Sequence, residues 1–224
     1  MKITFLGQAG LLLEEKELTV LIDPYLSHSV EKINPKSKRR VPVDESFFSV
    51  KPDVMIFTHN HLDHYDPETA ERFLAHGGSC TVLAPKSVWN EVRKFGGDHN
   101  YVCFNRHSSW SQGSCCFTAV KAEHSDDFAI GVLIENGEQT YYVTGDTLYN
   151  EEIFSDLPKK IDVLFLPVNG KGNNMNAVDA ARFAERTGAE KVVPFHIGMF
   201  DSLTADCFKI KNKITAEIYK EIEL

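Results

Sequence analysis

Three histidines and an aspartate stand within six positions of this chain, a density that suggests metal chemistry. They are His59, His61, Asp63 and His64, and they follow the apolar run at residues 54–57. Side chains two positions apart in an extended backbone project to the same side, so His59 and His61 can face one metal ion. Asp63 and His64 come where the chain must turn, and could face a second point a few ångströms away. Burying this cluster without a cation is costly, which favours a metal site over a purely structural role.

Three further candidate ligands, His124, Asp146 and His196, stand at or just past the ends of apolar strands expected downstream. Strand ends converge on one rim of a sheet, which is where such sites form. Five imidazoles and two carboxylates suit two divalent ions, with Zn as the default and Mn or Fe as alternatives. We assign structural roles to the remaining histidines, which lie in loops or near glycine turns: His28, His76, His99 and His107.

Asp23 ends another expected strand and is followed by Pro24. An acidic residue in this position is often only a turn former. The functional alternative is a carboxylate that lies behind a ligating histidine and accepts a hydrogen bond from its free ring nitrogen. The residue types alone leave both interpretations open.

The elements that must position these residues occur in a similar order in each half of the chain, with antiparallel strands first and βα units afterwards. Strands are expected over residues 2–6, 11–13, 18–22, 54–57, 81–83, 101–104, 115–122, 129–135, 139–144, 162–166 and 191–193. Helices are expected over residues 67–75, with Asp66 as N-cap and a stop at Gly77-Gly78, over 86–95 and over 177–187. The segment after Leu203 fits either a helix or a strand. We therefore predict an α/β fold, a four-layered αββα sandwich, in a single domain over residues 1–224.

Residues 24–50 show few strand or helix patterns, and a loop of that length in a compact domain is usually functional or mobile. Arg39 and Arg40 lie in a basic run between two prolines, where guanidinium groups could bind a substrate phosphate. A solvated charge run is the alternative.

Composition limits the classes of protein that this chain can be. The 224 residues are 42% hydrophobic and 25% charged, as expected for a globular protein. The net charge of -8 argues against a nucleic-acid partner, although locally clustered cations could still hold a small anionic substrate. We find no apolar run of membrane-spanning length and no signal-peptide pattern, so we expect no membrane association and a cytoplasmic location. Five cysteines without CxxC spacing predict reduced thiols.

The pattern His-x-His-x-Asp-His at residues 59–64, with His124, Asp146 and His196 downstream, resembles the metallo-β-lactamase superfamily. The resemblance covers essentially the whole chain, including the Leu-Ile-Asp-Pro motif at residues 21–24. More narrowly, residues 7–10, 23–25 and 194–196 are similar to the branch that contains L-ascorbate-6-phosphate lactonase and related bacterial metal-dependent hydrolases.

The resemblance implies a role for each candidate residue. One metal ion would be held by His59, His61 and His124, and the other by Asp63, His64 and His196. Asp146 would bridge the two ions, Asp23 would support the cluster by hydrogen bonding, and Asp63 would orient the attacking water or pass a proton to the leaving group. Ser125, Asn169 and Lys171 adjoin candidate ligands and are expected to contact substrate. No cysteine occupies a ligand position, unlike one subclass of true β-lactamases.

The function that this resemblance implies is hydrolysis of a small anionic ester, with a sugar-phosphate lactone as one example, by two Zn or Mn ions. Two alternatives share the fold: a phosphodiesterase and an iron-containing redox enzyme. A non-catalytic binding module is a further alternative, which the full ligand set disfavours. The sequence leaves the substrate and the oligomeric state open, with a homo-oligomer among the alternatives.

Overall fold

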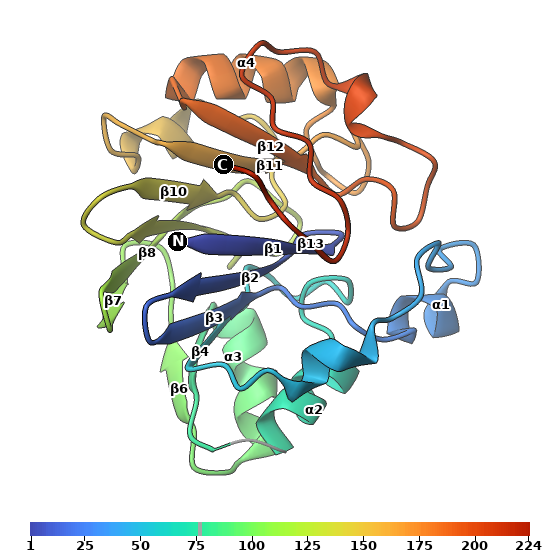
Figure 1. Cartoon of the computed structure of the whole chain (residues 1–224), viewed down its shortest axis with the longest axis vertical. Helices are drawn as coiled ribbons and strands as arrows, with labels where there is room; N and C mark the ends of the chain where they lie inside the picture. Colours follow the sequence, from blue (N-terminus) through green and yellow to red (C-terminus); the bar gives the residue numbers. More distant parts are fainter. Residues whose placement is uncertain (76–77) are drawn as a thin grey trace.

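The computed structural model describes residues 1–75 and 78–224. Two mixed β-sheets face each other, and helices cover the outer side of each (Figure 1). Helices α2 (Pro67–Ala75) and α3 (Lys86–Val92) cover the first sheet, and α4 (Ala177–Thr187) covers the second. The predicted four-layered αββα sandwich is therefore confirmed.

The first sheet has the strand order β13-β1-β2-β3-β4-β5-β6. Its strands are β1 (Lys2–Gly7), β2 (Gly10–Glu15), β3 (Leu18–Ile22), β4 (Val54–Ile56), β5 (Thr81–Ala84), β6 (Asn100–Cys103) and β13 (Lys220–Glu221). Strands β1 to β3 form the predicted antiparallel meander, and β3 to β6 pair in parallel. The carboxyl ends of β1, β3 and β4 consequently lie at the same rim.

The second sheet has the strand order β12-β11-β10-β9-β8-β7. Its strands are β7 (Ser109–Gln112), β8 (Cys115–Lys121), β9 (Ile130–Glu135), β10 (Thr140–Val143), β11 (Val163–Pro167) and β12 (Lys191–Phe195). Strands β10, β11 and β12 pair in parallel, and β8 runs in the same direction because it and β10 are both antiparallel to β9. Their carboxyl ends therefore also share one rim.

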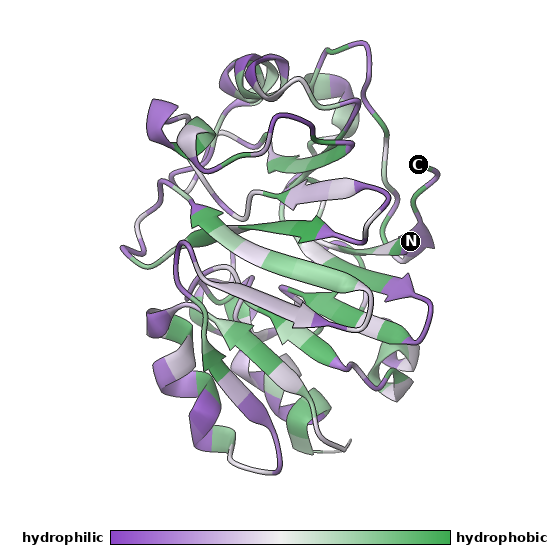
Figure 2. Cartoon of the chain, turned by 90° about the vertical axis from the view of Figure 1, so that its left-hand side faces the viewer, coloured by the Kyte–Doolittle hydropathy of each residue, from purple (hydrophilic) through white to green (hydrophobic). Residues whose placement is uncertain are grey.

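Strand β4 shows why the apolar run before the histidine cluster is continuous. Its side chains alternate between two buried faces, so Val54 and Ile56 pack between the sheets while Met55 packs toward helices α2 and α3. The hydrophobic strands fill the centre of the molecule and the hydrophilic segments lie mainly in loops and on outer helix faces (Figure 2). Parallel pairing with β3 and β5 sets the direction of this strand, and hence the rim at which its polar continuation emerges.

Four details differ from the predictions or extend them. The long loop at residues 24–50 contains the short helix α1 (Ser29–Ile33) and a 3-10 turn at Glu45–Ser49. The second predicted helix is α3 followed by the 3-10 turn Arg93–Phe95. Strand β7, a half-exposed polar segment, was not expected. The segment after Leu203, left open between helix and strand, forms a 3-10 turn at Ala205–Cys207 and the short strand β13, which pairs with β1. Of the predicted helix stop, Gly77 lies outside the described residues.

The histidines to which we assigned structural roles make local contacts. The ring of His28 lies 3.2 Å from Glu31, and that of His107 lies 3.2 Å from Asp156. The Nδ1 atom of His99 accepts a hydrogen bond from the backbone of Cys80. His76 lies outside the described residues. All five cysteines are free thiols, in line with the sequence-based expectation.

Asp156 links its own loop and the loop of Arg106 to the carboxyl end of β8 in the second sheet. Its carboxylate accepts two hydrogen bonds from the Arg106 guanidinium, at 2.6 and 2.8 Å, and one from the backbone nitrogen of Lys121 at 2.9 Å. Burial raises the pKa of Asp156, but these donors outweigh it and hold that pKa below the ordinary value of 3.8. A carboxyl group with a depressed folded-state pKa contributes stability above its unfolded-state pKa.

We therefore expect Asp156→Asn to lower the free energy of unfolding at pH 7 by about 1–3 kcal/mol. The difference in free energy of unfolding between the variant and the unaltered protein should persist down to about pH 4. It should shrink as the pH falls further, because the variant and the unaltered protein then both carry a neutral side chain at position 156. Urea unfolding across that range measures the effect, with Asp206→Asn as an exposed control. A loss of unfolding free energy in Asp156→Asn that stays constant well below pH 4 would contradict this explanation.

Candidate metal centre

The first group of candidate ligands gathers three imidazoles and one carboxylate. One donor atom each of His59, His61, His124 and Asp146 lie within 4.8 Å of one another. The rings of the three histidines are mutually spaced by 4.6 to 4.7 Å between centroids. His59 and His61 follow β4 in the first sheet, whereas His124 follows β8 and Asp146 follows β10 in the second. This group therefore spans both sheets.

The second group consists of Asp63, His64 and His196, whose donor atoms also lie within 4.8 Å of one another. The Nε2 atom of His196 lies 3.2 Å from Oδ2 of Asp63, and that of His64 lies 4.0 Å from the same oxygen. His196 directly follows β12, with a φ of 62° that turns the chain sharply out of the strand. This group again takes residues from both sheets.

Asp146 lies between the two groups. One of its oxygens is 3.2 Å from Nε2 of His64, and the other is 3.1 Å from Nε2 of His196. Gly145 brings this carboxylate close to β4: it has a φ of 60°, and a Cβ atom there would lie only 2.9 Å from the side chain of Thr58. Glycine thus permits the two sheets to approach at the point where the groups meet.

Three buried atoms test whether the cluster fits a metal. The Nε2 atom of His59 is buried without a hydrogen-bond partner among the described residues, and the buried Nε2 of His64 and Oδ1 of Asp146 form no well-aligned hydrogen bond, only an ion-pair contact with each other at 3.2 Å. Buried polar atoms are ordinarily paired, because leaving them unpaired costs free energy. Imidazole nitrogen and carboxylate oxygen are also the donors that Zn and similar divalent ions take. The residues present therefore fit divalent metal ions.

In the second group, the protein's own histidines neutralise the carboxylates. Burial lowers the pKa of His196, but the carboxylates of Asp146 and Asp63 together outweigh it and raise that pKa to about 9. The pKa of His64 is likewise raised above its ordinary value by Asp146 and Asp23, against the opposing effect of burial. His59 is different, because burial and the neighbouring His64 lower its pKa. The carboxylates thus hold positive charge at the second group.

Asp23 lies directly behind His64. Its fully buried carboxylate accepts hydrogen bonds from Nδ1 of His64 at 2.8 Å, from the backbone nitrogen of Thr58 at 2.8 Å and from the Thr58 hydroxyl at 2.5 Å. These contacts orient the His64 ring so that Nε2 faces Asp146. Of the two sequence interpretations of Asp23, the geometry favours the carboxylate that orients a ligand.

Three residues that the sequence analysis did not single out also hold the cluster in place. The buried Gln8 amide donates to Oδ2 of Asp63 at 2.6 Å, and its backbone oxygen accepts from the nitrogen of His196. Asn174 donates to Oδ2 of Asp146 at 2.8 Å. Asp126 accepts from the backbone nitrogen of Asn60, between two candidate ligands. Only Gln8 carried a sequence signal, as part of the strand-end motif at residues 7–10.

The expected substrate contacts fall into two sets. The Ser125 hydroxyl lies 3.1 Å from Nε2 of His61, and Asn169 and Lys171 line a cavity of about 330 Å³ beside His196. Arg39 and Arg40 are not among the residues that line this cavity.

Arg39 requires a correction to its expected role. It is 5% exposed, and its guanidinium donates to the backbone oxygens of Tyr25 and Val41 and to the Tyr219 hydroxyl. These bonds hold the long loop against the C-terminal segment, so we assign Arg39 to fixing the loop. The exposed Arg40 donates its backbone nitrogen to the oxygen of Met199.

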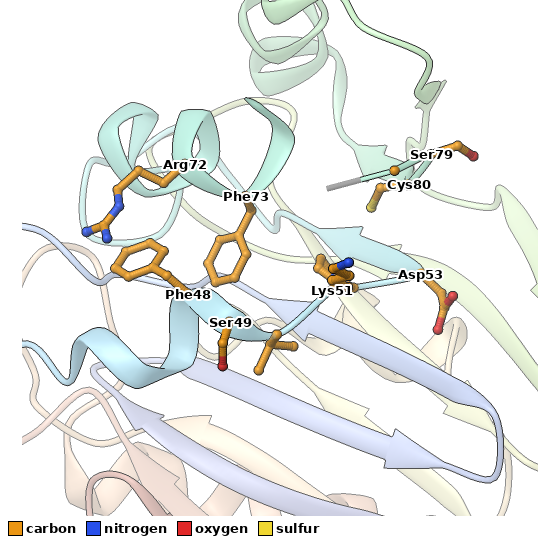
Figure 3. Close-up of a pocket in the computed structure, with 11 residues that line it drawn as sticks. Phe48, Ser49, Lys51, Asp53, Arg72, Phe73, Ser79 and Cys80 are labelled. Atoms are coloured by element: carbon orange, nitrogen blue, oxygen red, sulfur yellow. The ribbon is translucent and has the colours of Figure 1, made fainter. Parts of the chain in front are cut away.

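Another cavity, of about 240 Å³, lies before the amino ends of β4 and β5, at the end of these strands opposite the candidate ligands (Figure 3). Its polar groups are engaged in structural contacts: Arg72 lies over the Phe48 ring and pairs with Glu45, and Asp53 accepts from the backbone of Thr19. Burial raises the pKa of the Cys80 thiol to about 12, which keeps it protonated. Among the described residues that line this cavity, Arg72, Asp53 and Cys80 are therefore assigned to structural roles.

The fold and the ligand cluster together define the metallo-β-lactamase class of proteins. A sequence model of the family described as Beta-lactamase superfamily domain matches residues 19–197, a stretch that includes all seven candidate ligands. A UPF0173 metal-dependent hydrolase from Exiguobacterium sp. is 30% identical over 92% of this chain and 90% of its own length. The chain therefore belongs to the β-lactamase superfamily and, within it, to the UPF0173 metal-dependent hydrolases.

Solved structures share the fold. The isothiocyanate hydrolase from Delia radicum gut bacteria superposes with a TM-score of 0.73 at 16% identity, covering 100% of this chain and 99% of that one. Igni18, a metallo hydrolase from the archaeon Ignicoccus hospitalis, gives a TM-score of 0.67 at 21% identity, covering 88% of this chain and 82% of that one. Within the described residues, no helix is both long and apolar enough to span a membrane.

Proposed function

We propose that this chain is a hydrolase that uses two divalent metal ions, Zn or Mn, to activate water against a small anionic ester, with a sugar-phosphate lactone as the leading example. The observation that carries the proposal is the position of Asp146, whose two oxygens lie within 3.2 Å of histidines in the second ligand group while the same carboxylate belongs to the first. A carboxylate shared by two groups suits a bridging ligand.

The ligand assignment divides the cluster between the two ions. His59, His61 and His124 would hold one, Asp63, His64 and His196 the other, and Asp146 both. Bound divalent ions supply Lewis acidity toward the oxygen under attack and lower the pKa of water.

Asp63 is the carboxylate best placed for proton transfer. Its side chain is 18% exposed, whereas that of Asp146 is 3% exposed. Burial raises the pKa of Asp63, but the hydrogen bond from His196 and the nearby His64 outweigh it and keep that pKa well below its ordinary value. Asp63 is thus an anion at neutral pH that would orient the attacking water or pass a proton to the leaving group, while Gln8 fixes one of its oxygens.

Ser125 and the Asn169–Lys171 segment lie beside different ligand groups. Ser125 lies against His61 of the first ligand group, and Lys171 lines the cavity beside His196 of the second. We assign Ser125, Asn169 and Lys171 to substrate positioning, Ser125 next to the scissile bond and the other two further from it. The expected partner is a small metabolite, in a cytoplasmic setting.

The test combines metal analysis with a substrate screen. Elemental mass spectrometry of the purified protein should find about two Zn or Mn per chain, and added Zn or Mn should give metal-dependent cleavage of lactones in preference to phosphodiesters. Cleavage confined to phosphodiesters would select the phosphodiesterase alternative. Two irons per chain without hydrolysis would select the redox alternative, and absence of both metal and activity after metal addition would refute the proposal.

A further inference from the structure

The cavity beside His196 is built from three loops that follow strands of both sheets. Lys36 comes from the long loop after β3, Asn169 and Lys171 from the loop after β11, and Asp201 from the segment after β12. Gln8 and His196 line it on the side of the ligand cluster. A molecule that occupies this space therefore lies next to the second ligand group. A volume of about 330 Å³ suits a small metabolite.

Two lysines give this cavity its charge. Lys36 and Lys171 are both exposed, and they come from segments more than a hundred residues apart in sequence. Other lysines of the long loop are paired with acids: Lys32 lies 2.5 Å from Glu68, and Lys38 lies 3.9 Å from Glu31. Lys36 and Lys171 have no carboxylate within 4.0 Å in the part of the chain that the structure describes. Their ammonium groups are consequently available to a ligand.

Among the described residues that line the cavity, Asp201 is the one acid, and its carboxylate accepts hydrogen bonds within its own loop. Its Oδ1 atom accepts hydrogen bonds from the backbone nitrogens of Gly198 at 3.0 Å and Leu203 at 2.9 Å. These bonds fix the conformation of the segment after β12 and engage the Asp201 carboxylate within that segment. With two lysines and one aspartate, the described lining of the cavity carries an excess of positive charge on a chain whose net charge is -8. Such focusing attracts small anions even to an acidic protein.

We propose that Lys36 and Lys171 form a subsite for an oxyanion, a phosphate or carboxylate, that the substrate carries away from the bond to be cleaved. This inference rests on the proposed hydrolase function, because the cavity opens beside the ligand cluster. Two ammonium groups provide charge-assisted hydrogen bonds to such a group and fix the substrate's orientation relative to Asp63. The loop at residues 24–50 thus contributes to specificity through Lys36, whereas Arg39 holds the loop in position.

The experiment uses the metal-loaded full chain and three lactones: neutral gluconolactone, its phosphate monoester, and glucarolactone, which carries a carboxylate. The double variant Lys36→Gln/Lys171→Gln should lower kcat/KM for the phosphate monoester by about 10- to 100-fold, mainly through KM. The loss of kcat/KM for gluconolactone should be clearly smaller, because that substrate carries no oxyanion for the two lysines to bind. Comparison of the two charged lactones identifies which oxyanion the subsite takes. Lys38→Gln is the matched control from the same loop.

A binding measurement separates this inference from the proposed function. Calorimetry with inorganic phosphate should show an affinity for the metal-loaded protein that falls about 10-fold or more in the double variant and is unchanged in Lys38→Gln. If this loss is seen but no lactone is cleaved, the subsite stands and the proposed function fails. The opposite result is that the unaltered protein and the double variant cleave lactones with the same preference for charged over neutral substrates and bind phosphate equally well. In that case the function stands and the subsite is refuted.

Discussion

Replacing Asp146 with alanine is expected to remove metal from both ligand groups and to lower kcat/KM by about 10³-fold or more, equivalent to about 4 kcal/mol of transition-state stabilisation. The reason is geometric, since the carboxylate adjoins His64 and His196 and also belongs to the group formed by His59, His61 and His124. Elemental mass spectrometry after dialysis measures the metal, and initial rates on the best lactone measure the activity.

The matched control for Asp146→Ala is Asp206→Ala, an exposed aspartate in the segment after β12, which should keep both metal and activity. Circular dichroism checks that each variant is folded. Retention of two metal ions per chain in Asp146→Ala, with activity within about 10-fold of the unaltered protein, would show that this carboxylate bridges nothing.

Replacing Asp23 with asparagine should weaken metal binding at the group of Asp63, His64 and His196 by about 10- to 100-fold while leaving the protein folded. Asparagine keeps the size of the side chain and tolerates the φ of 42° found at this position. It removes the negative charge that accepts the hydrogen bond from Nδ1 of His64, and with it the force that aims Nε2 at Asp146. Competition with a chromophoric chelator measures the affinity.

Asp53→Asn separates this effect from a general loss of stability. Asp53 also accepts a backbone hydrogen bond beside β4, from the nitrogen of Thr19 at 2.8 Å, but it lies at the opposite end of the strand. This variant should lose some stability and keep its metal affinity. Equal weakening of metal binding in both variants would mean that Asp23 acts only through the fold.

The sequence predicted best what neighbouring residues determine. The meander of β1 to β3, the buried strand β4 and the helix that begins at Pro67 depend on local periodicity, turns and caps, and each was predicted within a few residues. The seven candidate ligands were predicted as a set because they lie at or soon after the ends of apolar strands, and strand ends converge.

The remaining features depend on contacts between distant residues. The conformation of the long loop is fixed partly by Arg39, which donates to Tyr219 far along the chain, and its sequence neighbours do not reveal that bond. Gln8, Asn174 and Asp126 each support a ligand to which no local pattern connects them. Lys36 lies in the basic run that the sequence marked, yet only the fold distinguishes it from Arg39 and Arg40 as the member that lines the cavity.

Both ligand groups draw residues from both sheets, and this has a consequence for the stability of the whole sandwich. An ion held by either group would cross-link the two halves of the chain at the rim where their strands end. Loading and folding are then linked by mass action, so that each tenfold rise in free metal above the dissociation constant adds about 1.4 kcal/mol to the folded state. The ligand cluster, once loaded, would thus also stabilise the contact between two halves that otherwise meet mainly through apolar side chains.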